Sequence, residues 1–109
     1  MDAPPIEIDA VEFDRLRRSE APPAVLDVRE PRELALCRFA ESIDIPLATL
    51  PGRVGELPLD RLLIVVCHHG VRSLSAVHWL RTQGIGNAVS LRGGIDAWAQ
   101  EIDTAMRTY

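Results

Sequence analysis

The sequence is short of the features that mark secreted and membrane proteins. It contains only two cysteines, Cys37 and Cys67, too few for a disulfide framework, so we expect two free thiols in a reducing compartment. Its longest purely aliphatic run, residues 62–66, is far too short to span a membrane. Residues 1–7 lack the basic start and the apolar stretch of a signal peptide. These shortages predict a soluble, cytoplasmic protein with no membrane partner.

The sequence also has fewer basic than acidic residues, 12 against 16. The formal net charge is -4, which gives no electrostatic footprint for nucleic acid. The chain has no run of like charges, no internal repeat and no low-complexity segment. Its 109 residues match one domain, and 47% hydrophobic residues suffice for one ordinary core. We therefore expect a single domain with its core in about residues 6–103, present as a monomer or weak homodimer.

Short apolar runs alternate with helical stretches along the chain, which predicts an α/β fold with a mainly parallel sheet. We expect strands at residues 6–8, 24–28, 43–45, 62–66 and 88–90, and helices at residues 10–19, 31–38, 73–83 and 95–102. Residues 47–56 fit a short helix or a structured loop, and the tail from Thr104 should be frayed. The aliphatic run 62–66 predicts a strand that is buried on both faces and hence central.

Two helix starts carry recognisable signals. Asp9 offers a side-chain cap, and Glu12 three residues later offers the second half of a capping box. Pro31 suits the first position of the next helix, because its missing N–H would have no partner there.

The segment that carries chemistry is the loop of residues 67–73, Cys-His-His-Gly-Val-Arg-Ser. It lies between the most buried predicted strand and a predicted helix, and ligands of open α/β sheets bind beyond the carboxyl ends of strands. The positive end of the helix and inward-pointing loop amides favour a thiolate at Cys67. Gly70 tolerates the curled backbone, and Arg72 adds a fixed charge near the mouth. The pattern predicts an activated nucleophile that is negatively charged, is reachable from water and needs no separate general base.

Four segments, in order, resemble the rhodanese family. The cysteine loop is similar to the family's Cys-x-x-Gly-x-Arg loop. Residues 26–30, 43–47 and 91–98 resemble its early strand and turn, its middle strand and its C-terminal signature. Residues 38–42 depart from the family's usual His-hydrophobic-Pro-Gly-Ala turn, a difference that concerns donor or partner preference more than the fold.

The resemblance implies a five-stranded, mainly parallel sheet with helices on both faces, and a double-displacement reaction. Cys67 would be the catalytic nucleophile, taking the outer sulfur of thiosulfate or another persulfide donor and passing it to cyanide, a thiol or a protein cysteine. Arg72 would also attract anionic donors. The residues expected to bind the transferred sulfur, through loop amides, are His68, His69, Gly70, Val71 and Arg72. We expect no cofactor and no metal, since adjacent histidines chelate poorly without further ligands.

Two other functions compete with sulfur transfer. Cysteine-dependent phosphatases and arsenate reductases also hold a thiolate in an amide cradle, but their loop is Cys-x5-Arg. Here the spacing from Cys67 to Arg72 is Cys-x4-Arg, a narrower ring better suited to one sulfur than to a phosphate. A non-enzymatic regulatory module of the same family is the second alternative, although the cysteine is present. A relay between two proteins would use the same persulfide.

Several further residues have structural explanations. Cys37 fits core packing better than a role as resolving cysteine. Asp27 fits a structural ion pair or turn cap, whereas Arg29 or Arg92, which follow strands, could add positive potential near the site. Trp79 and Trp98 fit packing roles, and His78 fits the surface of a helix. Gly93 and Gly94 fit a turn that could border the active site.

Overall fold

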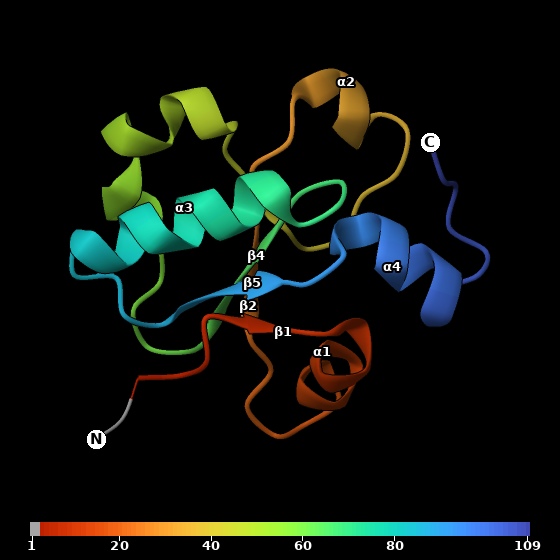
Figure 1. Ribbon diagram of the computed structural model, residues 1–109, viewed down its shortest axis with the longest axis horizontal. Coiled ribbons are helices and arrows are strands. Elements are labelled where there is room, and N and C mark those ends of the chain that lie inside the picture. Colours follow the sequence, from red (N-terminus) through yellow and green to blue (C-terminus); the bar gives the residue numbers. More distant parts are fainter. Residues whose placement is uncertain (1–2) are drawn as a thin grey trace.

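The protein is built on one fully parallel sheet of five strands (Figure 1). The computed structural model describes residues 3–109. The strands are β1 (Glu7–Ile8), β2 (Ala24–Asp27), β3 (Ile43–Asp44), β4 (Leu63–Val66) and β5 (Ala88–Leu91). They lie in the order β1-β5-β4-β2-β3, and every neighbouring pair is parallel. The α/β prediction is therefore confirmed, and the aliphatic run forms the central strand.

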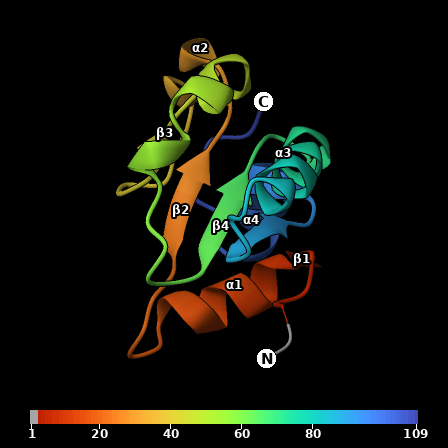
Figure 2. The ribbon, with the colours of Figure 1, turned by 90° about the vertical axis from the view of Figure 1, so that its left-hand side faces the viewer.

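Helices cover both faces of the sheet, as expected (Figure 2). One face carries α1 (Ala10–Arg17) and α4 (Gly94–Glu101), and the other carries α3 (Val71–Thr82). The connections include the short helix α2 (Pro31–Leu34) and two 3-10 helices, η1 (Leu47–Gly52) and η2 (Val54–Glu56). Among residues 3–109, no helix combines the length and apolar character needed to cross a membrane.

Strand β4 supplies side chains to both cores because successive residues point to opposite faces. Leu63 and Val65 pack in the core that includes Leu80 of α3. Ile64 and Val66 pack in the core that includes Trp98 of α4. Each such buried aliphatic side chain contributes roughly 1.5–3 kcal/mol. The next residue in this alternation is Cys67, so the strand that anchors the fold also fixes the position of the thiol.

The helix starts differ in part from the prediction. The Asp9 side chain caps α1 by accepting a hydrogen bond from the Glu12 amide at 2.9 Å. The Glu12 carboxylate instead binds Arg15 through two hydrogen bonds, so the second half of the expected capping box is not formed. Pro31 begins α2 as predicted, but this helix ends at Leu34 rather than near residue 37 or 38.

Helix α2 is followed by a turn that a buried arginine holds. The Arg29 guanidinium donates to the carbonyl oxygen of Cys37 at 2.7 Å and to that of Glu33 at 3.4 Å. The Glu33 carbonyl also accepts hydrogen bonds from the backbone amides of Leu36 and Cys37, so the chain stays turned beyond Leu34 without continuing the regular helix.

Candidate active site

The Cys67 sulfur lies in a cradle of hydrogen-bond donors. The backbone amides of Gly70 and Ser73 donate to Sγ over 3.1 and 3.3 Å. The Ser73 hydroxyl lies 3.4 Å from the same atom. Ser73 is in the first turn of α3, where helix amides have no partner within the helix. Gly70 is one of the five residues predicted to bind the sulfur through their amides, whereas Ser73 was not among them. Two amides directed at Sγ suit an anionic sulfur.

The thiol is more enclosed than expected. Cys67 is 1% exposed, so the prediction of a sulfur open to water is wrong for this conformation. The enclosure is polar on the side of the loop, where two amides donate to the sulfur and the thiol donates to the Ser73 hydroxyl oxygen. A donor must therefore displace part of the surrounding loop or its cover to reach the thiol.

The curl of the loop is held from outside by α4. The amides of Ile95 and Asp96 donate to the carbonyl oxygens of Cys67 and His68 at 2.9 and 3.1 Å. These bonds turn the carbonyls toward α4 and leave the loop amides facing the sulfur. Gly94 permits the close approach, because a Cβ there would overlap the His68 carbonyl and lie 2.5 Å from that of Cys67.

Gly70 provides the other condition for the curl. Its φ of +95° lies in the left-handed region that favours glycine, and a Cβ would lie 3.0 Å from the Gly93 amide nitrogen. Sequence reasoning assigned Gly93 and Gly94 to a turn that borders the site. It did not predict the two hydrogen bonds from α4 to the loop. The Gly-Gly pair at the start of a predicted helix was the available signal of such a close contact.

Arg72 lies beside the loop, but its charge is shared with a carboxylate. Its Nη1 and Nη2 donate to the two carboxylate oxygens of Glu33 on α2 at 2.7 and 2.9 Å. The Arg72 hydrogen bonds lower the pKa of Glu33 to about 2, and the same contact raises the pKa of Arg72. Glu33 was not among the predicted site residues, because it lies 39 positions away in the chain.

The C-terminal tail reaches the loop, so the expectation of a frayed tail is wrong. The Tyr109 ring stacks on His68 with 3.8 Å between ring centroids. Its hydroxyl donates to Glu33 at 2.7 Å and accepts from Arg29 at 2.9 Å. Burial raises the pKa of Tyr109 to about 12, so the hydroxyl stays neutral and able to donate near neutral pH.

The other two candidate arginines are also paired. Arg29 and Asp27 are both fully buried and joined by several hydrogen bonds, the shortest 2.8 Å long. Burial disfavours the Arg29 charge, but the hydrogen bonds to Asp27 and Tyr109 outweigh it and raise its pKa. Arg92 pairs with Glu7 at 3.1 Å. The structural interpretation of Asp27 is confirmed, and Arg29 holds the turn and the tail rather than a substrate.

The two loop histidines differ in environment. The His68 ring stacks on His69 as well as on Tyr109, and its Nε2 is buried without a hydrogen-bond partner among the described residues. His69 is largely exposed, with Nε2 3.8 Å from an Asp96 carboxylate oxygen. One ligand atom from each of these three residues lies within 4.8 Å of the others. This spacing is compatible with a shared metal ion, so the absence of a metal stays a prediction.

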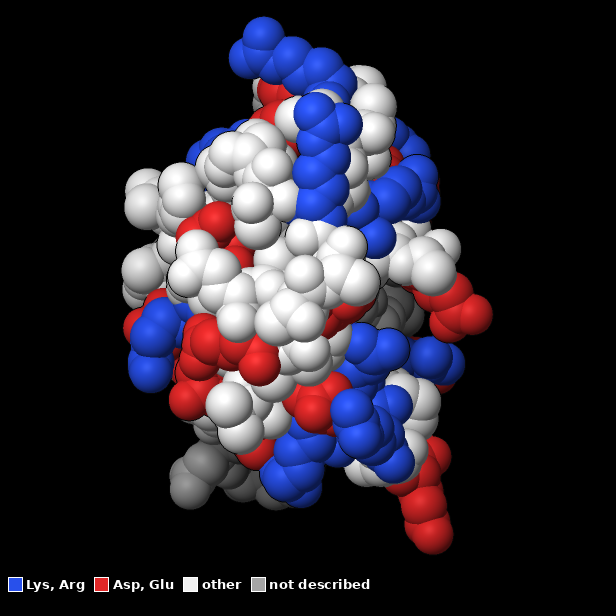
Figure 3. Space-filling model, turned by 90° about the vertical axis from the view of Figure 1, so that its right-hand side faces the viewer, with Lys and Arg blue, Asp and Glu red and all other residues white. Residues whose placement is uncertain are grey.

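The remaining candidates fall outside the cradle. Cys37 is a partly buried free thiol packed against the core of α1 and α4, in keeping with a packing role. Trp98 is buried with Phe13 and Trp79 packs against the opposite core, while His78 is exposed on α3. Basic and acidic side chains are interspersed over the face shown in Figure 3.

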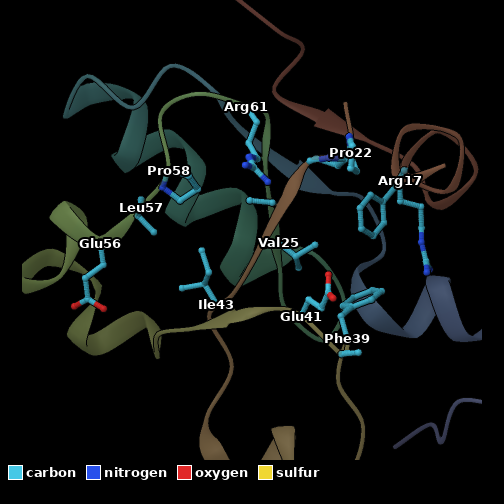
Figure 4. A pocket seen from close by; sticks show the side chains of 14 residues that line it. Arg17, Pro22, Val25, Phe39, Glu41, Ile43, Glu56, Leu57, Pro58 and Arg61 are labelled. Atoms are coloured by element: carbon cyan, nitrogen blue, oxygen red, sulfur yellow. The ribbon is translucent and has the colours of Figure 1, made fainter. Parts of the chain in front are cut away.

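A groove of about 840 Å³ opens at the other end of the sheet, near the starts of β2 and β3 (Figure 4). Its lining includes Val25, Phe39, Ile43 and Leu57, with Arg17, Glu41, Glu56 and Arg61 among its polar members. Cys67 follows the carboxyl end of β4, so this groove is separate from the sulfur cradle.

Known proteins share both the sequence pattern and this fold. The family described as Rhodanese-like domain matches residues 9–101. A sulfurtransferase from Allochromatium vinosum is 34% identical over 94 residues, which cover 86% of this chain and 88% of that protein. The thiosulfate sulfurtransferase GlpE from Stutzerimonas stutzeri is 35% identical over 74 residues, 68% of either chain.

A crystal structure of a rhodanese-related protein from Thermoplasma volcanium superposes with a TM-score of 0.80. It is 38% identical, and the match covers 88% of this chain and 92% of that one. Several other relatives are longer proteins, of which this chain covers 22–25%. The relatives support sulfurtransferase activity in general and an enzyme of the same type.

Proposed function

Because the chain belongs to the rhodanese-like domain family, we propose that it transfers a sulfane sulfur through a persulfide on Cys67. The observation that carries the proposal is the pair of backbone amides, of Gly70 and Ser73, that donate to Sγ, with the Ser73 hydroxyl 3.4 Å from the same atom. Such a set stabilises negative charge on sulfur without a second ionisable group. The terminal sulfur of a persulfide is also an anion and lies one S–S bond beyond Sγ, so we expect further amides of the same loop to stabilise it.

The reaction proceeds in two displacements. The Cys67 thiolate attacks the outer sulfur of thiosulfate, a new S–S bond forms, and the S–S bond of thiosulfate breaks as sulfite leaves with the electron pair. A thiophilic acceptor such as cyanide then attacks the terminal sulfur of the persulfide. The S–S bond to Cys67 breaks, the thiolate is restored and thiocyanate leaves. Neither step requires an oxidant, a reductant or a metal.

The loop residues divide this work. We expect the amides of residues 68–72 to surround the transferred sulfur, and the amides of Gly70 and Ser73 are already directed at Sγ. His68 and His69 form the stacked rim of the loop. Val71 is 77% exposed and meets the acceptor at the surface. Arg72 draws anionic donors, in competition with Glu33 for its guanidinium.

The donor is thiosulfate or another persulfide, and the acceptor is cyanide, a small thiol or a protein cysteine. Thiosulfate is the first donor to test, because one relative carries it in its name. A protein persulfide would use the same cradle, since only the sulfur being transferred must enter it.

Intact-protein mass spectrometry after thiosulfate treatment tests the proposal. We expect a gain of one sulfur mass that is lost on adding a thiol and is absent from Cys67→Ser, because the hydroxyl does not ionise in this cradle. Cys37→Ser is the matched control and should gain the sulfur as the wild type does. Cyanide-dependent thiocyanate release should follow the same pattern. Sulfur retained in Cys67→Ser, or phosphatase activity in place of sulfur transfer, would overturn the proposal.

A further inference from the structure

Two buried hydroxyls form a chain behind the cysteine. The Ser73 Oγ lies 3.4 Å from the Cys67 sulfur and 2.8 Å from the Ser90 Oγ. Ser73 is in the first turn of α3 and Ser90 is in β5, beside the central strand. Both serines are fully buried. Polar side chains without access to water require partners, so this chain is a fixed part of the site.

The two hydroxyls can be oriented in two ways, since each has one hydrogen to donate and lone pairs to accept with. When Cys67 is a neutral thiol, its S–H donates to Ser73 and the Ser73 hydroxyl donates to Ser90. When the sulfur is an anion, it can only accept, so Ser73 must donate to it. The Ser73 oxygen then accepts the hydrogen of Ser90. The sulfur's charge therefore sets the direction of both hydrogen bonds.

We propose that Ser90 is a positioning residue that lets the Ser73 hydroxyl follow the charge on the Cys67 sulfur. Ser90 accepts from Ser73 in the thiol state and donates to it in the thiolate and persulfide states. A hydroxyl that is itself the acceptor of a hydrogen bond is a stronger donor, so Ser90 strengthens the bond that Ser73 makes to an anionic sulfur. This inference rests on the proposed function and adds a residue that touches neither donor nor acceptor.

The chain orients a hydrogen bond and does not conduct a proton away. Within residues 3–109, the Ser90 side chain hydrogen-bonds only to Ser73. The proton that Cys67 loses must therefore leave through the mouth of the site. Ser90 therefore does not act as a general acid or base. We expect it to change the reactivity of the Cys67 sulfur without taking part in a proton transfer.

The pH profile of Cys67 alkylation measures this effect directly. Iodoacetamide reacts with the thiolate, and mass spectrometry of the peptide that contains Cys67 separates its rate from that of Cys37. We expect Ser73→Ala to move the midpoint of the profile upward by about one pH unit, the size of one hydrogen bond to a charged group. Ser90→Ala should move it in the same direction by a smaller amount. Ser75→Ala, an exposed serine on the same helix, should leave it in place.

The double variant makes the test specific. If Ser90 acts through Ser73, adding Ser90→Ala to Ser73→Ala should produce no further shift, whereas a general loosening of the site would add to it. Ser90→Thr keeps a hydroxyl at this position and should restore the wild-type midpoint. An unchanged midpoint in Ser90→Ala, additive shifts in the double variant, or a threonine variant that matches alanine would overturn the inference.

The same samples separate this inference from the proposed function. If wild-type protein gains no sulfur from thiosulfate or from a persulfide donor, the proposed function fails. If the wild type gains sulfur and Ser90→Ala keeps the wild-type midpoint, only the role of Ser90 fails. Urea denaturation of each variant at pH 7 establishes that the compared proteins are folded.

Discussion

Arg72 and Glu33 form a bidentate ion pair beside the loop that follows Cys67, with N–O distances of 2.7 and 2.9 Å. The pair joins the first turn of α3 to α2, and the Tyr109 hydroxyl adds a third hydrogen bond to the same carboxylate. The cation that should receive an anionic donor is thus already in contact with an anion. Under the proposed function, an anionic donor must compete with the Glu33 carboxylate for Arg72.

Glu33→Gln should improve the use of thiosulfate. Removing the carboxylate charge leaves Arg72 free to bind a dianion, so we expect KM for thiosulfate to fall by about fivefold, the effect of one partly screened charge. Steady-state thiocyanate formation at low ionic strength measures it. Glu41→Gln removes an equal charge at an exposed site away from the loop and should leave KM unchanged. A higher KM in Glu33→Gln would show that the ion pair itself shapes the donor site.

Arg72→Ala should have the opposite effect on the same constant. It removes the cation and leaves the Glu33 carboxylate to repel the donor, so KM for thiosulfate should rise by about tenfold. The free energy of unfolding should fall by about 1–2 kcal/mol, because Arg72 provides most of the stabilisation of the Glu33 carboxylate and the pair is partly exposed to solvent. Arg53→Ala breaks the exposed pair with Glu56 and serves as the kinetic control. Unchanged thiosulfate kinetics in Arg72→Ala would remove Arg72 from donor binding.

Acid should weaken the fold through Glu33. Hydrogen bonds from Arg72 lower the pKa of this carboxyl from 4.5 to about 2. A depressed pKa stabilises the folded state above pH 4.5, and this stabilisation is lost as the pH falls toward 2. After allowance for solvent screening it amounts to roughly 2 kcal/mol. Urea denaturation at pH 7, 4.5 and 3 should show a steeper loss for the wild type than for Glu33→Gln. Parallel losses in the two proteins would contradict the assignment.

Gly94→Ala should damage the catalytic loop from outside. A Cβ there would overlap the His68 carbonyl, and the φ of +63° is itself unfavourable for alanine. We expect a loss of about 2–4 kcal/mol in the free energy of unfolding, together with lower sulfur transfer. Gly52→Ala is the matched control, since nothing lies within 4 Å of its Cβ and it lacks a positive φ. Equal stability of the two variants would show that the α4 contact can relax.

Local signals in the sequence were enough to predict most of the fold. The unbroken aliphatic run before Cys67 predicted a central strand, and that strand places the cysteine at the carboxyl end of the sheet. Pro31 and Asp9 predicted two helix starts, which depend on neighbouring residues only. Gly70 predicted the curl of the loop, because few other residues adopt a positive φ.

The parts that sequence reasoning missed depend on contacts between distant segments. Tyr109 meets Arg29 across 80 positions, and no local pattern distinguishes this tail from a frayed one. Helix α2 is shorter than predicted, and the turn after it is held by the Arg29 side chain through the Cys37 carbonyl, a contact that helix propensity does not describe. The enclosure of Cys67 and the pairing of Arg72 have the same origin, since both follow from packing that forms only in the folded chain.

The hydrogen bonds from α4 to the catalytic loop also restrict how this scaffold can evolve. The amides of Ile95 and Asp96 bind two consecutive carbonyls, those of Cys67 and His68, so the helix fixes the length of this part of the loop. Inserting one residue after Cys67 would displace the His68 carbonyl from its partner and bring new atoms against Gly94. A loop one residue longer, as wide as a phosphate requires, would therefore need a matching change in the turn at Gly93 and Gly94. A single insertion without that change should give an inactive domain more readily than a phosphatase.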